Sequence, residues 1–285
     1  MKPDISEFSY GYSITDELAH KAGPSVTAAP VFPSLYREGQ DGGGYDLRLD
    51  LDGIPLFVQF KLADCMVRNT AHEAQNGDLV CPFYRMHLRH ARHSHQHEML
   101  LKLETKHEEV YYCAPGFHRL SELNDAYLRH QVCERSLWIL PSSVGRFQGP
   151  GEHYVSFRIP GRVFVHPEPR EALESTDFAT LSERIYSRYK KERDTALTDR
   201  RLLELADTLY DIAHGRREIA ERHRTDMPNR WSRRGLLDQE AFYARRDIRD
   251  ELSRRSPLEQ VAFYASMYFD LQMFVVQEHK APQAV

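Results

Sequence analysis

The chain has 285 residues, of which 41% are hydrophobic and 28% are charged. These values are typical of a globular protein with one large domain or two ordinary ones, and they exclude a wholly disordered or fibrous chain. The net charge of -4 and the pI near 6.4 exclude a surface that is basic throughout, so a nucleic acid would have to bind at a local basic groove.

The composition also predicts where the protein resides. Residues 1–7 lack an apolar signal core, and the most apolar stretch, residues 261–276, is interrupted by Ser266, Asp270 and Gln272. The four cysteines are widely separated and form no C-x-x-C pair, which favours reduced thiols. We therefore expect a soluble, cytoplasmic protein.

The first predicted elements are one helix and three strands. The helix begins at Thr15, a residue type that caps helix starts, and continues through Asp16 and Glu17. The strands are expected at residues 26–31, 45–51 and 55–61. Apolar and polar side chains alternate in the second strand, whose polar side carries Asp46, Arg48, Asp50 and Asp52. A turn at residues 52–53 would make the second and third strands neighbours.

The third strand ends with the triplet Gln59-Phe60-Lys61. Successive side chains of a strand point to opposite faces, so Gln59 and Lys61 are predicted to project together and Phe60 the other way. With Asp46 on the neighbouring strand, the set suits metal-dependent phosphodiester hydrolysis. Asp46 and the Gln59 carbonyl oxygen would bind Mg²⁺ or Mn²⁺, and Lys61 would orient the attacking water and offset negative charge.

Asp46 followed by Gln59-x-Lys61 resembles the core of the PD-(D/E)xK (restriction-endonuclease-like) nuclease superfamily, in the glutamine variant of Mrr-type nucleases. The resemblance implies an α/β fold, a metal-dependent endonuclease acting on nucleic acid, most naturally DNA, and a role in bacterial defence against foreign DNA. Three features depart from the family pattern. Gly44-Tyr45 precedes Asp46 in place of the proline, Gln59 replaces an acid, and residues 62–92 intervene where the family's second helix normally follows directly. A second carboxylate is therefore expected, from Glu17, named as a catalytic candidate, or from Glu38 or Asp50.

A histidine-rich segment follows, and it precedes a helix predicted at residues 96–106 and a strand at residues 110–114. Two interpretations are open: a zinc site, or a basic loop that contacts phosphates. Zinc is disfavoured, because its ligands usually converge from two segments and arginines are interspersed here. The histidines are His87, His90, His93, His95 and His97, and the arginines are Arg85, Arg89 and Arg92. A second [E/Q]-x-K triplet, Glu104-Thr105-Lys106, ends this helix and is interpreted as a chance match.

The later part of the chain predicts a change from mixed structure to helices. A helix is expected at residues 121–132, and strands at residues 136–140, 153–159 and 162–165. Pro160, Pro167 and Pro169 mark the change. We therefore predict a restriction-endonuclease-like mixed sheet flanked by helices at residues 1–168, followed by an α-helical domain at residues 169–285.

The helical part is predicted to bind either nucleic acid or a protein. Helices are expected near residues 178–189, 202–212, 238–254 and 257–277, the last with Ser256 and Glu259 as a capping box. A basic segment with an interleaved tryptophan could neutralise phosphates and stack a base; its predicted contact residues are Arg216, Arg217, Arg230, Trp231, Arg233 and Arg234. The alternative function is a non-catalytic scaffold that keeps a nuclease-like core and binds a partner subunit, or a second copy of itself, through these helices.

Overall fold

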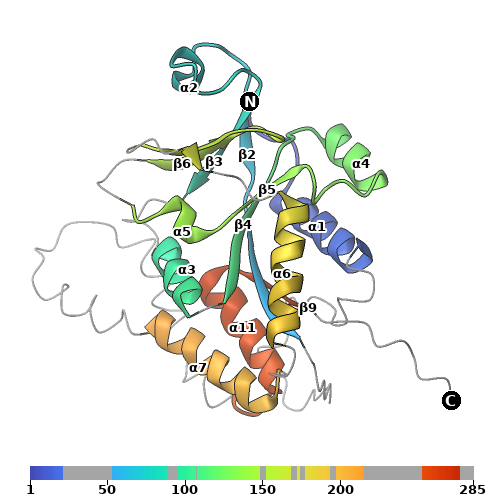
Figure 1. Ribbon diagram of the computed structural model, residues 1–285, viewed down its shortest axis with the longest axis vertical. Coiled ribbons are helices and arrows are strands. Elements are labelled where there is room, and N and C mark those ends of the chain that lie inside the picture. Colours follow the sequence, from blue (N-terminus) through green and yellow to red (C-terminus); the bar gives the residue numbers. More distant parts are fainter. Residues whose placement is uncertain are drawn as a thin grey trace, which may run out of the picture.

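Two β-sheets organise the part of the chain that the computed structural model describes, which is residues 1–21, 53–88, 95–106, 108–147, 152–167, 172–173, 177–192, 197–214 and 252–276. The first sheet has the strand order β5-β4-β1-β9 and the second β2-β3-β6-β7-β8 (Figure 1). The predicted mixed α/β fold is thus confirmed at this coarse level. No helix of the described ranges is both long and apolar enough to cross a membrane.

The first sheet is mixed. Its strands are β1 (Ile54–Phe60), β4 (Glu109–Pro115), β5 (Ser136–Ile139) and β9 (Gln272–Val276). β1 runs parallel to β4, and its other edge pairs antiparallel with β9. β1 and β4 are buried almost throughout, as expected for strands that are covered on both faces. β1 therefore lies inside the sheet, with both edges hydrogen-bonded.

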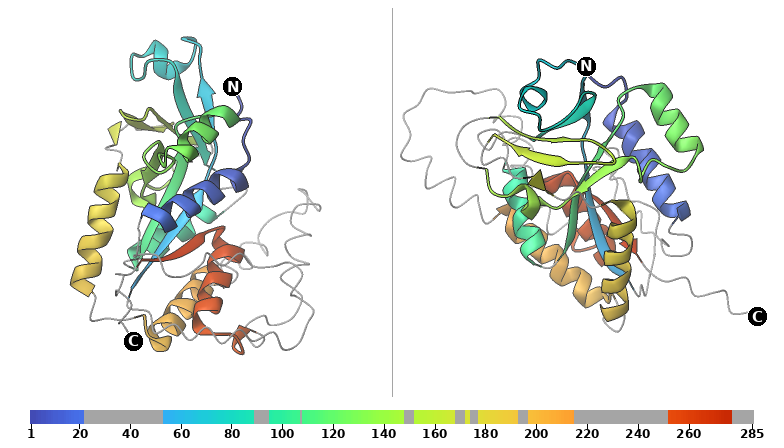
Figure 2. Two further views of the ribbon diagram at one scale, coloured as in Figure 1. Left: turned by 90° about the vertical axis from the view of Figure 1, so that its right-hand side faces the viewer. Right: turned by 45° about the horizontal axis from the view of Figure 1, so that its top comes forward.

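Helices cover both faces of the first sheet (Figures 1 and 2). One face packs against α1 (Glu7–Lys21), α4 (Leu120–Leu128) and α6 (Phe178–Glu192), in a cluster that includes Leu56 and Val58 of β1. The other packs against α3 (Gln96–Thr105), α7 (Asp199–His214) and α11 (Pro257–Phe269), in a cluster that includes Phe57. Alternation along β1 thus sends neighbouring side chains into two different cores.

The second sheet is entirely antiparallel. It consists of β2 (Ala63–Met66), β3 (Phe83–Leu88), β6 (His153–Phe157), β7 (Val163–His166) and β8 (Ala172–Leu173). One face joins the core beneath α3, and the other carries the short helix α2 (His72–Gln75). The remaining short helix, α5 (Pro141–Val144), follows β5.

Several expected elements are present with changed bounds. The strand predicted at residues 55–61 is β1, and the helix and strand predicted at residues 96–106 and 110–114 are α3 and β4. The first helix begins at Glu7 rather than Thr15, because Tyr10, Ile14 and Leu18 form one buried stripe along it. The strands expected at residues 26–31 and 45–51 and the helix at residues 238–254 lie wholly or largely outside the described residues.

The last predicted helix requires a correction. It ends at Phe269 instead of continuing to residue 277, because Asp270 adopts the left-handed conformation that terminates helices. Residues 272–276 then form β9 in the first sheet. The part expected to be all-helical therefore contributes two strands, β8 and β9, and both large clusters contain residues from each side of residue 168.

Candidate functional site

Gln59 and Lys61 lie at the C-terminal end of β1 and project to the same side. Gln59 is fully buried, and the side chain of Lys61 is 11% exposed. Phe60 points the other way, where its ring meets Tyr10 of α1 edge to face at 5.9 Å. The backbone N–H of Lys61 donates to the carbonyl oxygen of Cys113, which extends the pairing with β4 by one residue. The sheet thus holds both side chains at the carboxyl end of two parallel strands, where α/β proteins commonly bind ligands.

The carboxylate that meets these two side chains is Asp270, between α11 and β9. Its Oδ2 atom lies 3.5 Å from Gln59 Nε2 and 3.9 Å from Lys61 Nζ. Gln96, the first residue of α3, also approaches Oδ2, at 3.4 Å. Sequence reasoning missed Asp270 as a site residue, because nothing local in the chain pairs it with β1. The only local signal for Asp270 in the sequence was its position as an acid at the end of the amphipathic run that begins at residue 257.

Only one of the two polar atoms of the Gln59 amide has a hydrogen-bond partner among the described residues. Its Nε2 donates toward Asp270, whereas Oε1 is buried and has no hydrogen-bond partner among the described residues. The amide nitrogen of Gln59, rather than its oxygen, must face Asp270, since an ionised carboxylate can only accept hydrogen bonds. A buried acceptor without a partner costs about 1–3 kcal/mol. Such a cost is expected where an oxygen is reserved for a ligand such as a cation or a water molecule.

Tyr112 and His97 form the wall beside Gln59. Tyr112 of β4 is the register partner of Gln59, and its hydroxyl lies 2.9 Å from His97 Nδ1. Burial lowers the pKa of His97 to about 4, so its ring is neutral at pH 7. Nε2–H therefore donates to the Gly145 carbonyl oxygen at 2.6 Å, and Nδ1 accepts from Tyr112. Phe147 stacks on His97 with ring centroids 4.1 Å apart. This wall is buried, hydrogen-bonded and uncharged at pH 7.

Glu17 does not join this site. It lies on α1, which covers the opposite face of the first sheet, together with Leu56 and Val58. Its carboxylate is buried and accepts a hydrogen bond from the backbone N–H of Val132 at 2.6 Å. Glu17 therefore serves the packing of α1, and the prediction of a catalytic role for it is corrected. The helical stripe that buries α1 also turns this acid away from Gln59.

Asp46, Glu38 and Asp50 lie outside the described residues, as does the basic segment with Arg216, Arg217, Arg230, Trp231, Arg233 and Arg234. The strand containing Asp46 was expected to pair directly with β1. Instead, β4 pairs with residues 56–60 of β1, and β9 with residues 54–58. The acid that accompanies Gln59 and Lys61 in the described part of the chain therefore comes from the β9 side.

Within the described residues of the histidine-rich segment, His87 and His97 do not converge on one point. His87 lies on β3 in the second sheet, with Nε2 3.4 Å from Asp64, whereas His97 is buried in α3 beneath the first sheet. His90 and His93 lie outside the described residues. Within the described ranges, no group of three or more His, Cys, Asp or Glu side chains could hold a metal ion.

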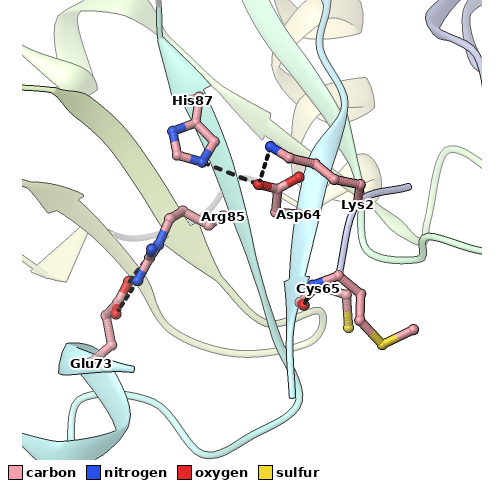
Figure 3. A network of polar contacts seen from close by, with 7 residues as sticks. Lys2, Asp64, Cys65, Glu73, Arg85 and His87 are labelled. Carbon is pink, nitrogen blue, oxygen red and sulfur yellow. Dashed lines mark hydrogen bonds and ion pairs between the residues drawn. The ribbon is translucent and has the colours of Figure 1, made fainter. Parts of the chain in front are cut away.

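Polar neighbours of His87 are engaged in structural ion pairs (Figure 3). Arg85 binds the fully buried carboxylate of Glu73 with both an Nε and an Nη atom. Lys2 pairs with Asp64 at 2.8 Å. Arg85 is thus committed to Glu73 rather than offered to a phosphate.

The second triplet, Glu104-Thr105-Lys106, also has a structural role. The Glu104 carboxylate accepts hydrogen bonds from the backbone N–H and the hydroxyl of Ser142, in the first turn of α5. It therefore anchors α5 to α3, and interpreting this triplet as a chance match agrees with its position.

No family model, curated protein or solved structure matches this chain. The likeness to PD-(D/E)xK nucleases consequently depends on the Asp46 and Gln59-x-Lys61 pattern alone. What the described geometry offers is a carboxylate, an amide oxygen and an ammonium group at one end of β1. This set can bind a hard cation through oxygen and stabilise negative charge beside it.

Proposed function

We propose that the protein is a metal-dependent endonuclease that hydrolyses nucleic acid phosphodiesters with Gln59 and Lys61. The observation that carries this proposal is the convergence of the Gln59 amide nitrogen and the Lys61 ammonium group on the carboxylate of Asp270, with the amide oxygen of Gln59 buried and unpartnered. Structural ion pairs alone do not require a buried acceptor without a partner. A cation bound by oxygen would satisfy it.

The side chains present fit Mg²⁺ or Mn²⁺. Gln59 Oε1 is a neutral oxygen donor in a fixed position, and Asp46 is proposed as a carboxylate ligand. When bound, the ion supplies a water of lowered pKa at neutral pH. Lys61 has a positive charge held by a mostly buried side chain, so it can orient that water and offset charge that develops on the phosphate.

Asp46 is within reach of this position. It precedes Gly53, at the start of β1, by seven residues, whereas Gln59 follows Gly53 by six. A chain of seven residues spans up to about 25 Å when extended, and six residues of strand span about 20 Å. The connection is therefore long enough to bring Asp46 to the Gln59 end of β1, without direct pairing to the strand.

The substrate is proposed to be DNA, as in the nucleases that the motif resembles. The basic residues Arg216, Arg217, Arg230, Arg233 and Arg234 would neutralise backbone phosphates, with Trp231 available for stacking. As in the nucleases that the motif resembles, the proposed role is restriction of foreign DNA in a bacterium. A protein partner or self-association through the helices is compatible with this role.

Plasmid cleavage tests the proposal. We expect purified wild-type protein to nick supercoiled plasmid with Mg²⁺ or Mn²⁺ and not with EDTA, and Lys61→Ala to lose activity by about 100-fold or more. Lys2→Ala is the matched control, because Lys2 is also a lysine paired with an aspartate but is exposed, and its partner Asp64 is in the second sheet. Failure of the wild type to cut DNA or RNA with any divalent ion, or equal cutting by Lys61→Ala, would favour the scaffold alternative.

A further inference from the structure

We propose that Asp270 is a metal-ligating carboxylate of the active site, supplied by the turn between α11 and β9. The inference rests on the proposed function and deepens it, since it assigns the site a residue outside the Gln59-x-Lys61 motif. It also makes the C-terminal part of the chain a component of the site. Four observations support it.

The first observation is convergence from separate elements. Gln59 and Lys61 come from β1 and Gln96 from α3, and all three direct nitrogen atoms at Asp270 Oδ2. Gln59 and Asp270 are 211 residues apart in the sequence. The contacts to Oδ2 measure 3.4–3.9 Å, at or beyond the limit of ordinary hydrogen bonds. They orient the carboxylate without consuming its capacity to bind a cation.

The second observation is the backbone conformation of Asp270. Its φ of 56° and ψ of 42° are left-handed, the conformation in which glycine is the least costly residue. The cap itself is made by the backbone N–H of Asp270, which donates to Ala265 and Ser266 carbonyl oxygens. Glycine would make the same cap, so the carboxylate is dispensable for ending the helix.

The third observation is the distribution of oxygen atoms. All polar contacts of the carboxylate with described residues are made by Oδ2, and the side chain is 58% exposed. Oδ1 is therefore left to solvent, and the neighbouring Gln59 side chain, whose Nε2 approaches Oδ2, keeps its buried Oε1 without a partner. One charged and one neutral oxygen, one of them reachable from water, form the beginning of a magnesium site, which normally keeps several water ligands.

The fourth observation is the strand register. The β9 ladder ends where Val58 pairs with Gln272, and Asp270 lies just beyond, where β1 continues to Gln59 and Lys61. An acid that leads into one strand thus faces an amide and a lysine at the end of its antiparallel neighbour. The sequence predicted this relation for Asp46, and the structure shows it for Asp270.

Direct measurement of Mn²⁺ binding tests the proposal without requiring catalysis. Titration of full-length protein, followed by calorimetry and by the electron paramagnetic resonance of free Mn²⁺, should show weakened binding in Asp270→Asn and Asp270→Gly. Because changing even a residue that only supports a metal ligand costs about 10- to 100-fold, we expect a loss of at least that size. Asp125→Asn is the matched control, since Asp125 is also a half-exposed aspartate that binds cationic side chains, Arg129 and Arg135.

The outcomes separate this inference from the proposed function. If both Asp270 variants fold and bind Mn²⁺ as tightly as wild type, the inference is wrong, while plasmid cleavage that depends on Lys61 would still support the nuclease. If the variants lose Mn²⁺ binding but the wild type cuts no nucleic acid, the metal site stands and the nuclease proposal fails. Wild-type protein that binds no Mn²⁺ would overturn both. The glycine variant guards against misfolding, because glycine suits this backbone.

Discussion

The side-chain amide of Gln96 donates a hydrogen bond to the carbonyl oxygen of Phe269 at 2.8 Å, so that the first residue of α3 holds the last residue of α11. The same nitrogen lies 3.4 Å from Asp270 Oδ2. Gln96 is buried, and the carbonyl it satisfies belongs to a helix end. It therefore fixes the turn that positions the Asp270 carboxylate.

Replacing Gln96 with Met should weaken both the turn and the site. We expect a loss of about 1 kcal/mol in the free energy of unfolding, because a buried carbonyl loses its donor. We also expect weaker Mn²⁺ binding, measured by titration, because Asp270 loses an orienting contact. Gln260→Met is the control, since Gln260 is on α11 and donates to the Arg255 carbonyl oxygen at 3.0 Å. It should lose similar stability with unchanged Mn²⁺ affinity; a parallel loss of affinity would contradict the positioning role.

Asp270→Gly should leave the protein at least as stable as wild type. Glycine removes the strain of a non-glycine residue in the left-handed region, which is worth up to about 1 kcal/mol. The lost ion pair with Lys61 is long and half-exposed, so it offsets little of this gain. Urea unfolding measures the difference. A loss of more than 1 kcal/mol would show that the carboxylate is needed for folding. The reciprocal control is Gly77→Ala, which introduces strain at a φ of 75° where no neighbouring atom interferes.

His97 should make the protein less stable as the pH falls from neutrality. Burial lowers its pKa from 6.5 to about 4, so the unfolded chain takes up a proton before the native state does. Stability that is complete above pH 6.5 is then lost between pH 6.5 and 4, by about 3 kcal/mol at 1.36 kcal/mol per pKa unit. Urea unfolding at several pH values tests this. His97→Phe, which keeps a ring against Phe147, should be less stable at pH 7 and show a flatter profile; an unchanged slope would assign the effect to other groups.

Arg85 should be essential to folding rather than to activity. Burial by itself raises the pKa of Glu73, but the hydrogen bonds and charge of Arg85, together with a backbone hydrogen bond and the charge of His166, outweigh burial and hold the pKa below 4.5. Arg85→Met leaves a buried carboxylate and should cost about 3–5 kcal/mol at pH 7. The deficit should shrink in acid, because the wild type loses the contribution of the ionised pair as the pH falls through the native pKa of Glu73.

Arg129→Met is the comparison for Arg85→Met, because Arg129 pairs with Asp125 on the exposed surface of α4. Its loss should cost less than about 1 kcal/mol. Equal costs for the two variants in urea unfolding at pH 7 would contradict the importance of burial at Glu73.

The position of Gln59 and Lys61 could be predicted because it depends on a local rule. Alternation within a strand places both side chains on one face, whatever the strand pairs with, and the apolar run before them indicated a buried strand. The predicted neighbour could not be derived as securely. Both edges of β1 bond to strands that are distant in sequence, and one of them, β9, is an aromatic and apolar run that also suits a helix.

Asp270 and Glu17 show that the sequence alone does not reveal which acid lies beside Gln59: Asp270 was missed, and Glu17 was wrongly included. An acid at a helix end and an acid within a helix look alike in a sequence, and only the packing of α1 and α11 on opposite faces of the sheet separates their roles. The histidines show a similar limit. Alternation on β3 leaves His87 exposed, whereas His97 is buried in α3, although only ten residues separate them in the sequence.

The pairing of β1 with β9 has a consequence for biosynthesis. β1 leaves the ribosome long before residues 272–276, so one of its edges stays open while most of the protein is being made. Open strand edges invite pairing with other chains, and contacts between distant segments form slowly. This edge of β1 therefore needs protection in the nascent chain. The three side chains of the candidate site come together only after β9 has been synthesised; they are Gln59, Lys61 and Asp270. The proposed site therefore stays incomplete while most of the chain is being synthesised.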